Sequence, residues 1–189
     1  AAKPAVSVHG RLWSGGRLST SGPTTQLMGA VVKLSILMPV YNEQEHVAEA
    51  LKQTLAVDYP CDVEMIVVDD GSRDGTADVL RSVDDPRVRV FTHPRNRGKG
   101  AAIRTAAQNA EGDYLVIMDA DLEYDPQDLP KLLAPVMDGR ARVVYGNRVF
   151  GAHTAYSFWY VMGNKAITTA ANIFYNSYLG DLETCFKLM

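Results

Sequence analysis

Short apolar runs alternate with amphipathic segments over most of the chain. Nearly continuous apolar residues predict five strands, the first of them buried on both faces: 34–40, 63–68, 88–91, 114–118 and 143–145. Helical spacing of apolar residues predicts the helices between them: one after Asn42, one over about 76–82, one from Gly98 to Gly112 and one from Asp125. This alternation of strands and helices predicts an α/β fold with an open, mostly parallel sheet and helices on both faces.

Capping residues mark the ends of three predicted helices. Asn42 followed three residues later by Glu45 predicts a capping box. Asp125 and Pro126 predict the N-cap and the first residue of a later helix. Gly112 is typical of the residue that follows a helix C-terminus.

Residues 1–30 differ from the rest of the chain. They are rich in Gly, Ser, Thr and Ala, and the first acidic residue is Glu43. They contain no apolar core of signal-peptide length. We interpret them as a disordered or extraneous tail, or as an extension before a natural start at Met28. Since 189 residues are too few for two full domains, 31–189 is expected to be one domain.

Composition excludes some classes of function. The net charge is −3 and no basic run occurs, so nothing indicates a nucleic-acid partner. Cys61 and Cys185 lie far apart, beside apolar residues, and are typical of reduced, packed thiols in a cytosolic protein. No run approaches the ~18 apolar residues of a membrane-spanning helix, although contact with a membrane surface stays open.

Acidic residues cluster directly after the strand over 114–118. Asp119 and Asp121 are separated by one residue, and Glu123 continues the alternation. Carboxylates in this arrangement suit a hard divalent cation such as Mg²⁺ or Mn²⁺, which could bridge a diphosphate. A solvated acidic turn before the helix at Pro126 would give the same pattern, so this motif alone leaves both interpretations open.

A second acidic pair, Asp69-Asp70, follows the strand over 63–68 and precedes Gly71 and Ser72. A carboxylate at the end of a buried strand can accept hydrogen bonds from a base or a ribose. Ordinary turn chemistry explains Gly71, Ser72 and the helix-capping position of Asp74, but it explains the paired aspartates poorly.

The run Asn96-Arg97-Gly98-Lys99-Gly100 opens a helix and resembles a phosphate-binding loop. It departs from the Walker A pattern at His93 and at Gly100, and no dinucleotide-binding glycine motif follows the first strand. Nucleotide binding is therefore expected without the signatures of an NTPase or an oxidoreductase.

The ordered motifs together resemble family 2 glycosyltransferases. The motifs are Pro39-Val-Tyr-Asn-Glu43, Val67-Val-Asp-Asp-Gly-Ser72, Asn96-Arg-Gly-Lys-Gly100, Met118-Asp-Ala-Asp-Leu-Glu123, Gly146-Asn-Arg148 and Asp181-Leu-Glu-Thr-Cys-Phe-Lys187. The last, here called the closing motif, is similar to that of the polyisoprenyl-phosphate branch, which includes dolichyl-phosphate sugar transferases. The resemblance covers 33–189 and implies a GT-A-type, Rossmann-like fold.

The resemblance implies a role for each matching residue. Pro39, Tyr41, Glu43, Asp70, Lys99 and Asp119 would bind the nucleotide. Asp119, Asp121 and Glu123 would hold Mg²⁺ or Mn²⁺, and the catalytic residues would be Asp121, Arg148 and Asp181. Many relatives carry another residue at the position of Glu123, and most continue past the closing motif. We therefore expect the domain to be truncated at its C-terminus, with part of the acceptor site or a membrane anchor missing.

The implied activity is metal-dependent, inverting transfer of a hexose from a GDP-mannose or UDP-glucose type donor to a polyisoprenyl phosphate. A phosphate acceptor is already an anion and needs cations rather than a general base, and Arg148 and Lys165 are the candidates. A hydroxyl acceptor in cell-wall or polysaccharide synthesis would instead need a base such as Asp181. A non-catalytic nucleotide-sugar-binding subunit is the third alternative.

The segment 156–179 suggests where the acceptor is bound. It is rich in aromatic residues and contains a single charged residue, Lys165. Such a helix can lie in a lipid interface or pack against protein, and its periodicity does not separate the two. We expect a cytoplasmic protein at the cytoplasmic face of a membrane.

Overall fold

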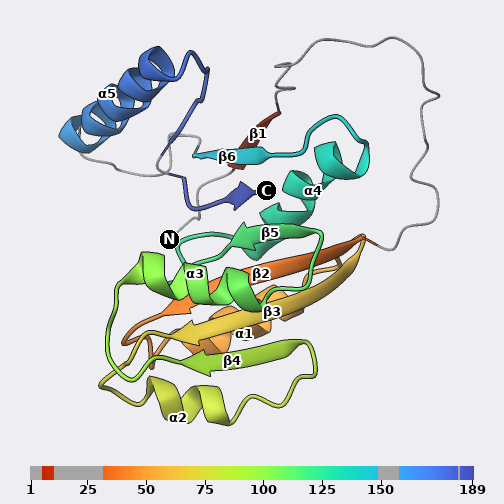
Figure 1. Cartoon of the computed structure of the whole chain (residues 1–189), viewed down its shortest axis with the longest axis vertical. Helices are drawn as coiled ribbons and strands as arrows, with labels where there is room; N and C mark the ends of the chain where they lie inside the picture. The colour runs from red at the N-terminus through yellow and green to blue at the C-terminus, as the bar shows by residue number, and fades with distance from the viewer. Residues whose placement is uncertain (1–5, 11–31, 149–157, 183) are drawn as a thin grey trace.

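A seven-stranded sheet with the order β1-β6-β7-β5-β2-β3-β4 forms the centre of the computed structural model (Figure 1). The structure describes residues 6–10, 32–148, 158–182 and 184–189. The strands are β1 (Val6–Gly10), β2 (Lys33–Val40), β3 (Asp62–Asp69), β4 (Val88–Thr92), β5 (Tyr114–Ile117), β6 (Val144–Arg148) and β7 (Lys187–Leu188). The helices are α1 (Val47–Leu55), α2 (Thr76–Arg81), α3 (Lys99–Asn109), α4 (Leu129–Met137) and α5 (Phe158–Phe174), with a 3₁₀ turn, η1, at Pro126–Asp128.

Four of the five predicted strands pair in parallel, as the alternation of strands and helices predicts. β2 pairs with β3 on one side and with β5 on the other, and β4 extends the sheet beyond β3. β7 joins β5 to β6, the fifth predicted strand, by antiparallel pairing, and β1 pairs antiparallel with β6. The carboxyl ends of β2, β3 and β5 therefore meet at one edge, where ligands bind in open α/β sheets.

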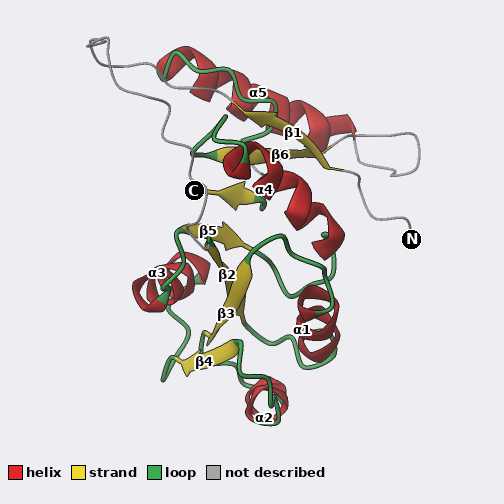
Figure 2. Cartoon of the chain, turned by 90° about the vertical axis from the view of Figure 1, so that its right-hand side faces the viewer, coloured by secondary structure: helices red, strands yellow, loops and turns green. Residues whose placement is uncertain are grey.

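Helices lie on both faces of the parallel strands, as predicted (Figure 2). Ile36 and Met38 of β2 pack in the core that includes α1 and α4, whereas Leu37 packs with Ala102 and Ala106 of α3. Successive residues of a strand point to opposite faces, so β2 is apolar throughout because both of its faces are covered. α5 lies apart from these layers, at the β1–β6 end of the sheet (Figures 1 and 2).

Two predicted helix boundaries are wrong. α1 begins at Val47 after His46, which makes no side-chain cap, and its first turn starts from the Glu43 carbonyl. Asn42 has a φ of 54° and accepts a hydrogen bond from Arg73 N–H, so its side chain connects two loops and caps no helix.

Gly112 is also not a helix-ending residue, because α3 ends at Asn109 and is followed by extended backbone at Ala110. A Cβ at Gly112 would lie 2.6 Å from Ser35 Oγ, so glycine is required there by close approach to β2. The third boundary is confirmed, since the Asp125 side chain accepts from Gln127 N–H at the start of η1.

Two strands were not predicted. β7 has only two residues, too few for a periodic pattern, and β1 lies within the segment that we interpret as a tail. Residues 1–5 and 11–31 lie outside the described part, so the division of the chain into tail and domain stays a prediction. Cys61 and Cys185 are free thiols, as expected.

Candidate active site

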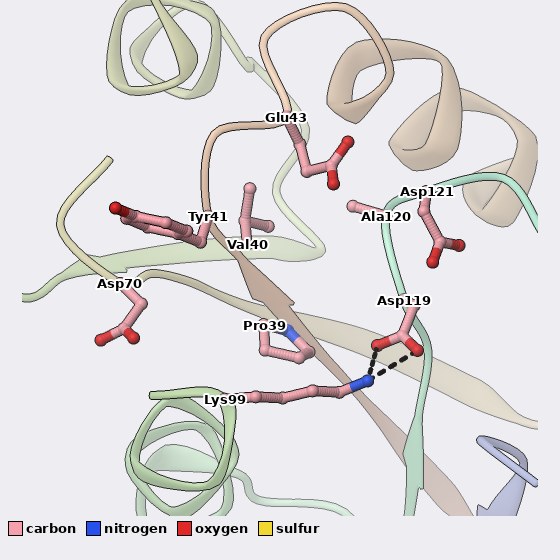
Figure 3. Close-up of a pocket in the computed structure, with 9 residues that line it drawn as sticks. All are labelled: Pro39, Val40, Tyr41, Glu43, Asp70, Lys99, Asp119, Ala120 and Asp121. Carbon is pink, nitrogen blue, oxygen red and sulfur yellow. Dashed lines mark hydrogen bonds and ion pairs between the residues drawn. The ribbon is translucent and has the colours of Figure 1, made fainter. Parts of the chain in front are cut away.

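A pocket opens at the carboxyl ends of β2, β3 and β5 (Figure 3). Its lining comprises Pro39, Val40, Tyr41, Glu43, Asp70, Lys99, Asp119, Ala120 and Asp121. All six residues that the resemblance assigns to nucleotide binding are among them, together with Asp121. Parallel pairing explains this grouping, because it places the ends of three separate strands side by side.

The loops after β2 and β3 are hydrogen-bonded to each other. Asn42 N–H donates to Ser72 Oγ over 2.9 Å, and Glu43 N–H donates to Thr76 Oγ1 over 2.9 Å. Gly75 N–H donates to Gln44 Oε1 over 2.8 Å. These bonds hold the part of the rim that carries Tyr41 and Glu43 against the start of α2.

Gly71 adopts a φ of +71° in the loop after β3, and a Cβ there would lie 2.5 Å from the Arg95 carbonyl carbon. We expect Gly71→Ala to lower the free energy of unfolding by about 3 kcal/mol, from left-handed strain and from overpacking against backbone. Gly139 is the matched control, since its φ is +67° but nothing lies within 4 Å of its Cβ position.

Urea denaturation of both variants measures the difference. Gly139→Ala is expected to cost about 1–2 kcal/mol, the strain alone. Equal losses in the two variants would show that the contact between Gly71 and Arg95 does not constrain the pocket.

The two aspartates after β3 have different environments. Asp69 Oδ1 accepts from Ser72 N–H at 3.0 Å, which is turn chemistry. Asp70 is 2% exposed, lines the pocket and accepts from a buried histidine, His93, at 2.6 Å. Burial alone would raise the pKa of Asp70, but the hydrogen bonds from His93 and from backbone N–H groups lower it below the ordinary value. Asp70 is therefore an anion at neutral pH.

Lys99 and Asp119 form an ion pair across the pocket (Figure 3). The ammonium of Lys99 lies 2.7 Å from both carboxylate oxygens. Burial alone would lower the pKa of Lys99, but its hydrogen bond and its charge interaction with Asp119 outweigh burial and raise the pKa. The Lys99 ammonium and the Asp119 carboxylate thus form a pair of opposite charges beside the N-terminus of α3.

The closing motif reaches the same carboxylate. Cys185 Sγ donates to Asp119 Oδ2 over 2.9 Å, and Cys185 N–H donates to Tyr124 Oη over 3.1 Å. The Tyr124 ring packs on Phe186, with the ring centroids 4.8 Å apart. Burial, followed by the charge of Asp119, raises the pKa of the Cys185 thiol, so the group is a neutral donor. The interpretation of Cys185 as a packed thiol missed this contact, because sequence spacing cannot show which strand ends meet.

The predicted site of three carboxylates is not preformed. Asp119 and Asp121 line the pocket, but Glu123 is exposed and is not part of the lining. Leu122 has a φ of 61°, which ends the strand-like alternation that would have placed Glu123 beside Asp121. Within the described ranges, no cluster of three or more His, Cys, Asp or Glu side chains is arranged to hold a metal.

Two carboxylates still match one mode of metal binding. Mg²⁺ usually takes one or two protein carboxylates and completes its shell with substrate phosphates and water rather than with an all-protein cage. Asp119 and Asp121 are therefore the residues that could hold Mg²⁺ or Mn²⁺ together with a bound diphosphate.

Lys165, expected to bind the acceptor, and Asp181, expected to be catalytic, do not line this pocket. Lys165 is exposed on α5, and Asp181 is 2% exposed and accepts from Asn164 Nδ2 at 3.0 Å. Arg148 ends β6, and its side chain lies outside the described residues. The pocket thus contains the expected donor residues but neither Lys165 nor Asp181.

Comparison with known proteins identifies the family of this chain. The profile of Glycosyl transferase family 2 matches residues 35–188, which include every motif quoted above. The chain belongs to glycosyl transferase family 2. Its resemblance to this family in the order of the motifs is thereby confirmed.

Relatives within the family include lipid-phosphate sugar transferases. The chain is 40% identical over 123 residues to an undecaprenyl-phosphate 4-deoxy-4-formamido-L-arabinose transferase of Pseudomonas fluorescens, covering 61% of this chain and 36% of the relative. It is 31% identical over 160 residues to an uncharacterized glycosyltransferase of Haemophilus influenzae, covering 82% of this chain and 60% of that one. The family 2 chain thus spans about a third of the first relative's length.

Solved structures confirm the GT-A fold of this family 2 chain. TarS 1-349 of S. aureus in complex with UDP-GlcNAc matches with a TM-score of 0.53 and 26% identity, covering 59% of this chain and 33% of that one. The same protein in complex with UDP matches equally well, with a TM-score of 0.53.

Proposed function

We propose that this family 2 domain transfers a sugar from a nucleotide-sugar donor to the phosphate of a polyprenyl lipid. The observation that supports the donor site is the pocket at the ends of three strands, which is lined by Tyr41 and Glu43 and by the carboxylates of Asp119 and Asp121. The names of the relatives, which are undecaprenyl-phosphate sugar transferases, support the acceptor half.

The nucleotide is proposed to lie between Tyr41 and the Asp119–Asp121 turn. The Tyr41 side chain is 39% exposed at the rim, which leaves an aromatic face for a base. Glu43 lines the same side and can accept from ribose hydroxyls. The UDP and UDP-GlcNAc complexes of TarS support a uridine nucleotide, and a GDP-linked sugar is the other expected donor.

The diphosphate is proposed to lie over Lys99, Asp119 and Asp121. Mg²⁺ or Mn²⁺ held by the two aspartates would stabilise the charge of the leaving diphosphate. The Lys99 ammonium, which pairs with Asp119 in this structure, would bind a phosphate oxygen of the donor. Cys185 donates to Asp119 Oδ2, one of the two oxygens that Lys99 contacts. Displacement at the anomeric carbon would then proceed with inversion.

A phosphate acceptor removes the need for a general base, because it is already an anion. This agrees with the position of Asp181, which is buried, bound to Asn164 and absent from the pocket lining. We propose that Asp181 positions the closing motif against α5, and that Arg148 and Lys165 hold the acceptor phosphate. Guanidinium and ammonium groups are the usual partners of a phosphate.

α5 supplies an apolar surface that suits a lipid interface. Large apolar side chains are exposed on it or directly after it: Trp159, Met162, Ile167, Ile173, Phe174, Tyr175 and Tyr178. An aromatic surface of this kind with one Lys can lie at the boundary of head groups and acyl chains. None of the helices in the described ranges combines the length and the apolar character needed to cross a membrane. We propose peripheral contact with the cytoplasmic face of a membrane.

The proposal that the acceptor is a polyprenyl phosphate is tested by comparing undecaprenyl phosphate with undecaprenol as acceptors of radiolabelled sugar in detergent micelles. The proposal predicts transfer to the phosphate at a rate at least a hundredfold above that to the alcohol, because the alcohol lacks an anionic nucleophile and finds no base. Equal transfer to both would contradict the proposal and would favour a hydroxyl acceptor with Asp181 as the base to examine.

A further inference from the structure

His93 is buried at the edge of the donor pocket although it does not line it. It is 6% exposed, and its Nδ1 lies 2.6 Å from Asp70 Oδ1. Its Nε2 lies 2.9 Å from Thr105 Oγ1 of α3. Since the Asp70 carboxylate is ionised and can only accept, Nδ1 carries the proton of this hydrogen bond. The histidine is therefore fixed between the end of β3 and α3.

Asp70 uses most of its acceptor capacity within the protein. In addition to His93, its oxygens accept from Arg97 N–H at 3.0 and 3.1 Å and from Gly98 N–H at 2.7 Å. A carboxylate offers about four lone-pair sites. Few remain for a nucleotide, so the principal contact of Asp70 is with the backbone that leads into α3.

This backbone makes few other hydrogen bonds, although Arg95 packs closely against Gly71 at the end of β3. Residues 94–97 are exposed, and nothing lies within 4 Å of a Cβ built at Gly98, where φ is +89°. One further hydrogen bond, from Gly98 N–H to Asn96 Oδ1 at 3.1 Å, lies within the turn itself. Within the described residues, the bonds to Asp70 are therefore the hydrogen bonds that tie residues 94–98 to the end of β3.

The turn at residues 94–98 determines the position of Lys99, the first residue of α3. Lys99 follows Gly98 directly, and its ammonium pairs with both oxygens of Asp119. A continuous series of contacts therefore runs from His93 through Asp70 and the N–H groups of Arg97 and Gly98 to Lys99. A displacement of the turn would move the ammonium away from Asp119.

We propose that His93 is a positioning residue of the donor site, which acts through Asp70 on the turn at Arg97 and Gly98 and so places Lys99 against Asp119. The effect of His93 on sugar transfer rests on the proposed function, whereas the effect of His93 on the turn and on Lys99 does not. A residue that only filled space would be replaced without loss by an apolar side chain of similar size. A positioning residue needs its hydrogen-bond donor.

The test compares His93→Leu, which keeps volume and removes the donor, with His93→Asn, whose Nδ2 can replace Nδ1. Amide exchange by NMR without ligand is expected to be roughly tenfold or more faster at Arg97 and Gly98 in His93→Leu. His93→Asn should stay within about threefold of the unaltered protein. His93→Ala replaces the leucine variant if that variant does not fold.

Lys99 gives a second measurement without ligand. Its acylation by acetic anhydride, followed by mass spectrometry, is expected to be faster in His93→Leu, because the amine is released from Asp119, and near the original rate in His93→Asn. Unchanged amide exchange or unchanged Lys99 acylation in His93→Leu would overturn the proposal.

A double-mutant cycle connects the turn to the donor. With UDP and GDP in the presence of MnCl₂ as probes, His93→Leu is expected to weaken binding about tenfold, and to have no further effect once Lys99 is replaced by alanine. Additive effects would overturn action through Lys99. If the unaltered protein binds neither nucleotide, the proposed function fails, and the exchange and acylation results still decide the role of His93.

Discussion

Replacing Asp119 with asparagine is expected to lower the rate of sugar transfer by about a hundred- to a thousandfold, the loss typical of removing one electrostatic contact to a developing charge. Asp119 contacts Lys99 and Cys185 and shares the pocket with Asp121. An amide of the same shape keeps the packing but removes the negative charge that would hold a divalent cation. Steady-state transfer kinetics at saturating donor measure the loss.

Asp138→Asn is the matched control for this substitution. Asp138 also pairs with a cation, the Arg140 guanidinium at 2.6 Å, but it is exposed and lies outside the pocket. Its replacement should leave transfer within about twofold, because exposed ion pairs contribute little. If Asp119→Asn retains full activity with an unaltered fold, the two-carboxylate site is not the place where the diphosphate leaves.

Lys99→Ala is expected to lower transfer by about ten- to a hundredfold. The ammonium would bind a phosphate oxygen of the donor, and charge-assisted hydrogen bonds contribute about 1.5–3 kcal/mol. The loss should also occur in the affinity for the free nucleoside diphosphate, since the contact is made to the phosphates and not to the sugar. Titration calorimetry and transfer kinetics measure the two effects separately.

Lys131→Ala controls for the loss of an ion pair as such. The Lys131 ammonium on α4 lies 2.5 Å from Asp128 Oδ1 at the end of η1, outside the pocket. Its replacement should change neither nucleotide affinity nor transfer. Equal losses in Lys99→Ala and Lys131→Ala would show that the effect is general destabilisation and not loss of a phosphate contact.

The parallel strands and the donor residues were predictable because they depend on local patterns. Continuous apolar runs identify strands covered on both faces, and parallel pairing then brings together whatever follows each strand. The resemblance to family 2 then assigned Tyr41, Asp70 and Asp119 to nucleotide binding before any geometry was known, and the structure places all three in one pocket.

Other features depend on long-range contacts that leave no local pattern. β7 contributes only Lys187 and Leu188 to the sheet, and this pairing brings Cys185 to Asp119 across 66 positions of sequence. His93 occupies the place where a phosphate loop would have glycine, which was the one signal of its role, but its contact with Asp70 spans 23 positions. The left-handed φ of Leu122, which separates Glu123 from Asp121, is rare for leucine and was not predictable.

Calorimetric titration of the protein with a panel of UDP- and GDP-sugars, with MnCl₂ or with excess EDTA, tests the central claim most directly. The claim is that the pocket lined by Tyr41, Asp70, Lys99, Asp119 and Asp121 binds a nucleotide-sugar donor together with a divalent cation. The account predicts saturable binding of one nucleotide class at one site, weakened about tenfold or more by EDTA and by Asp119→Asn. Absence of binding to every donor, or equal affinity with and without the metal, would contradict it.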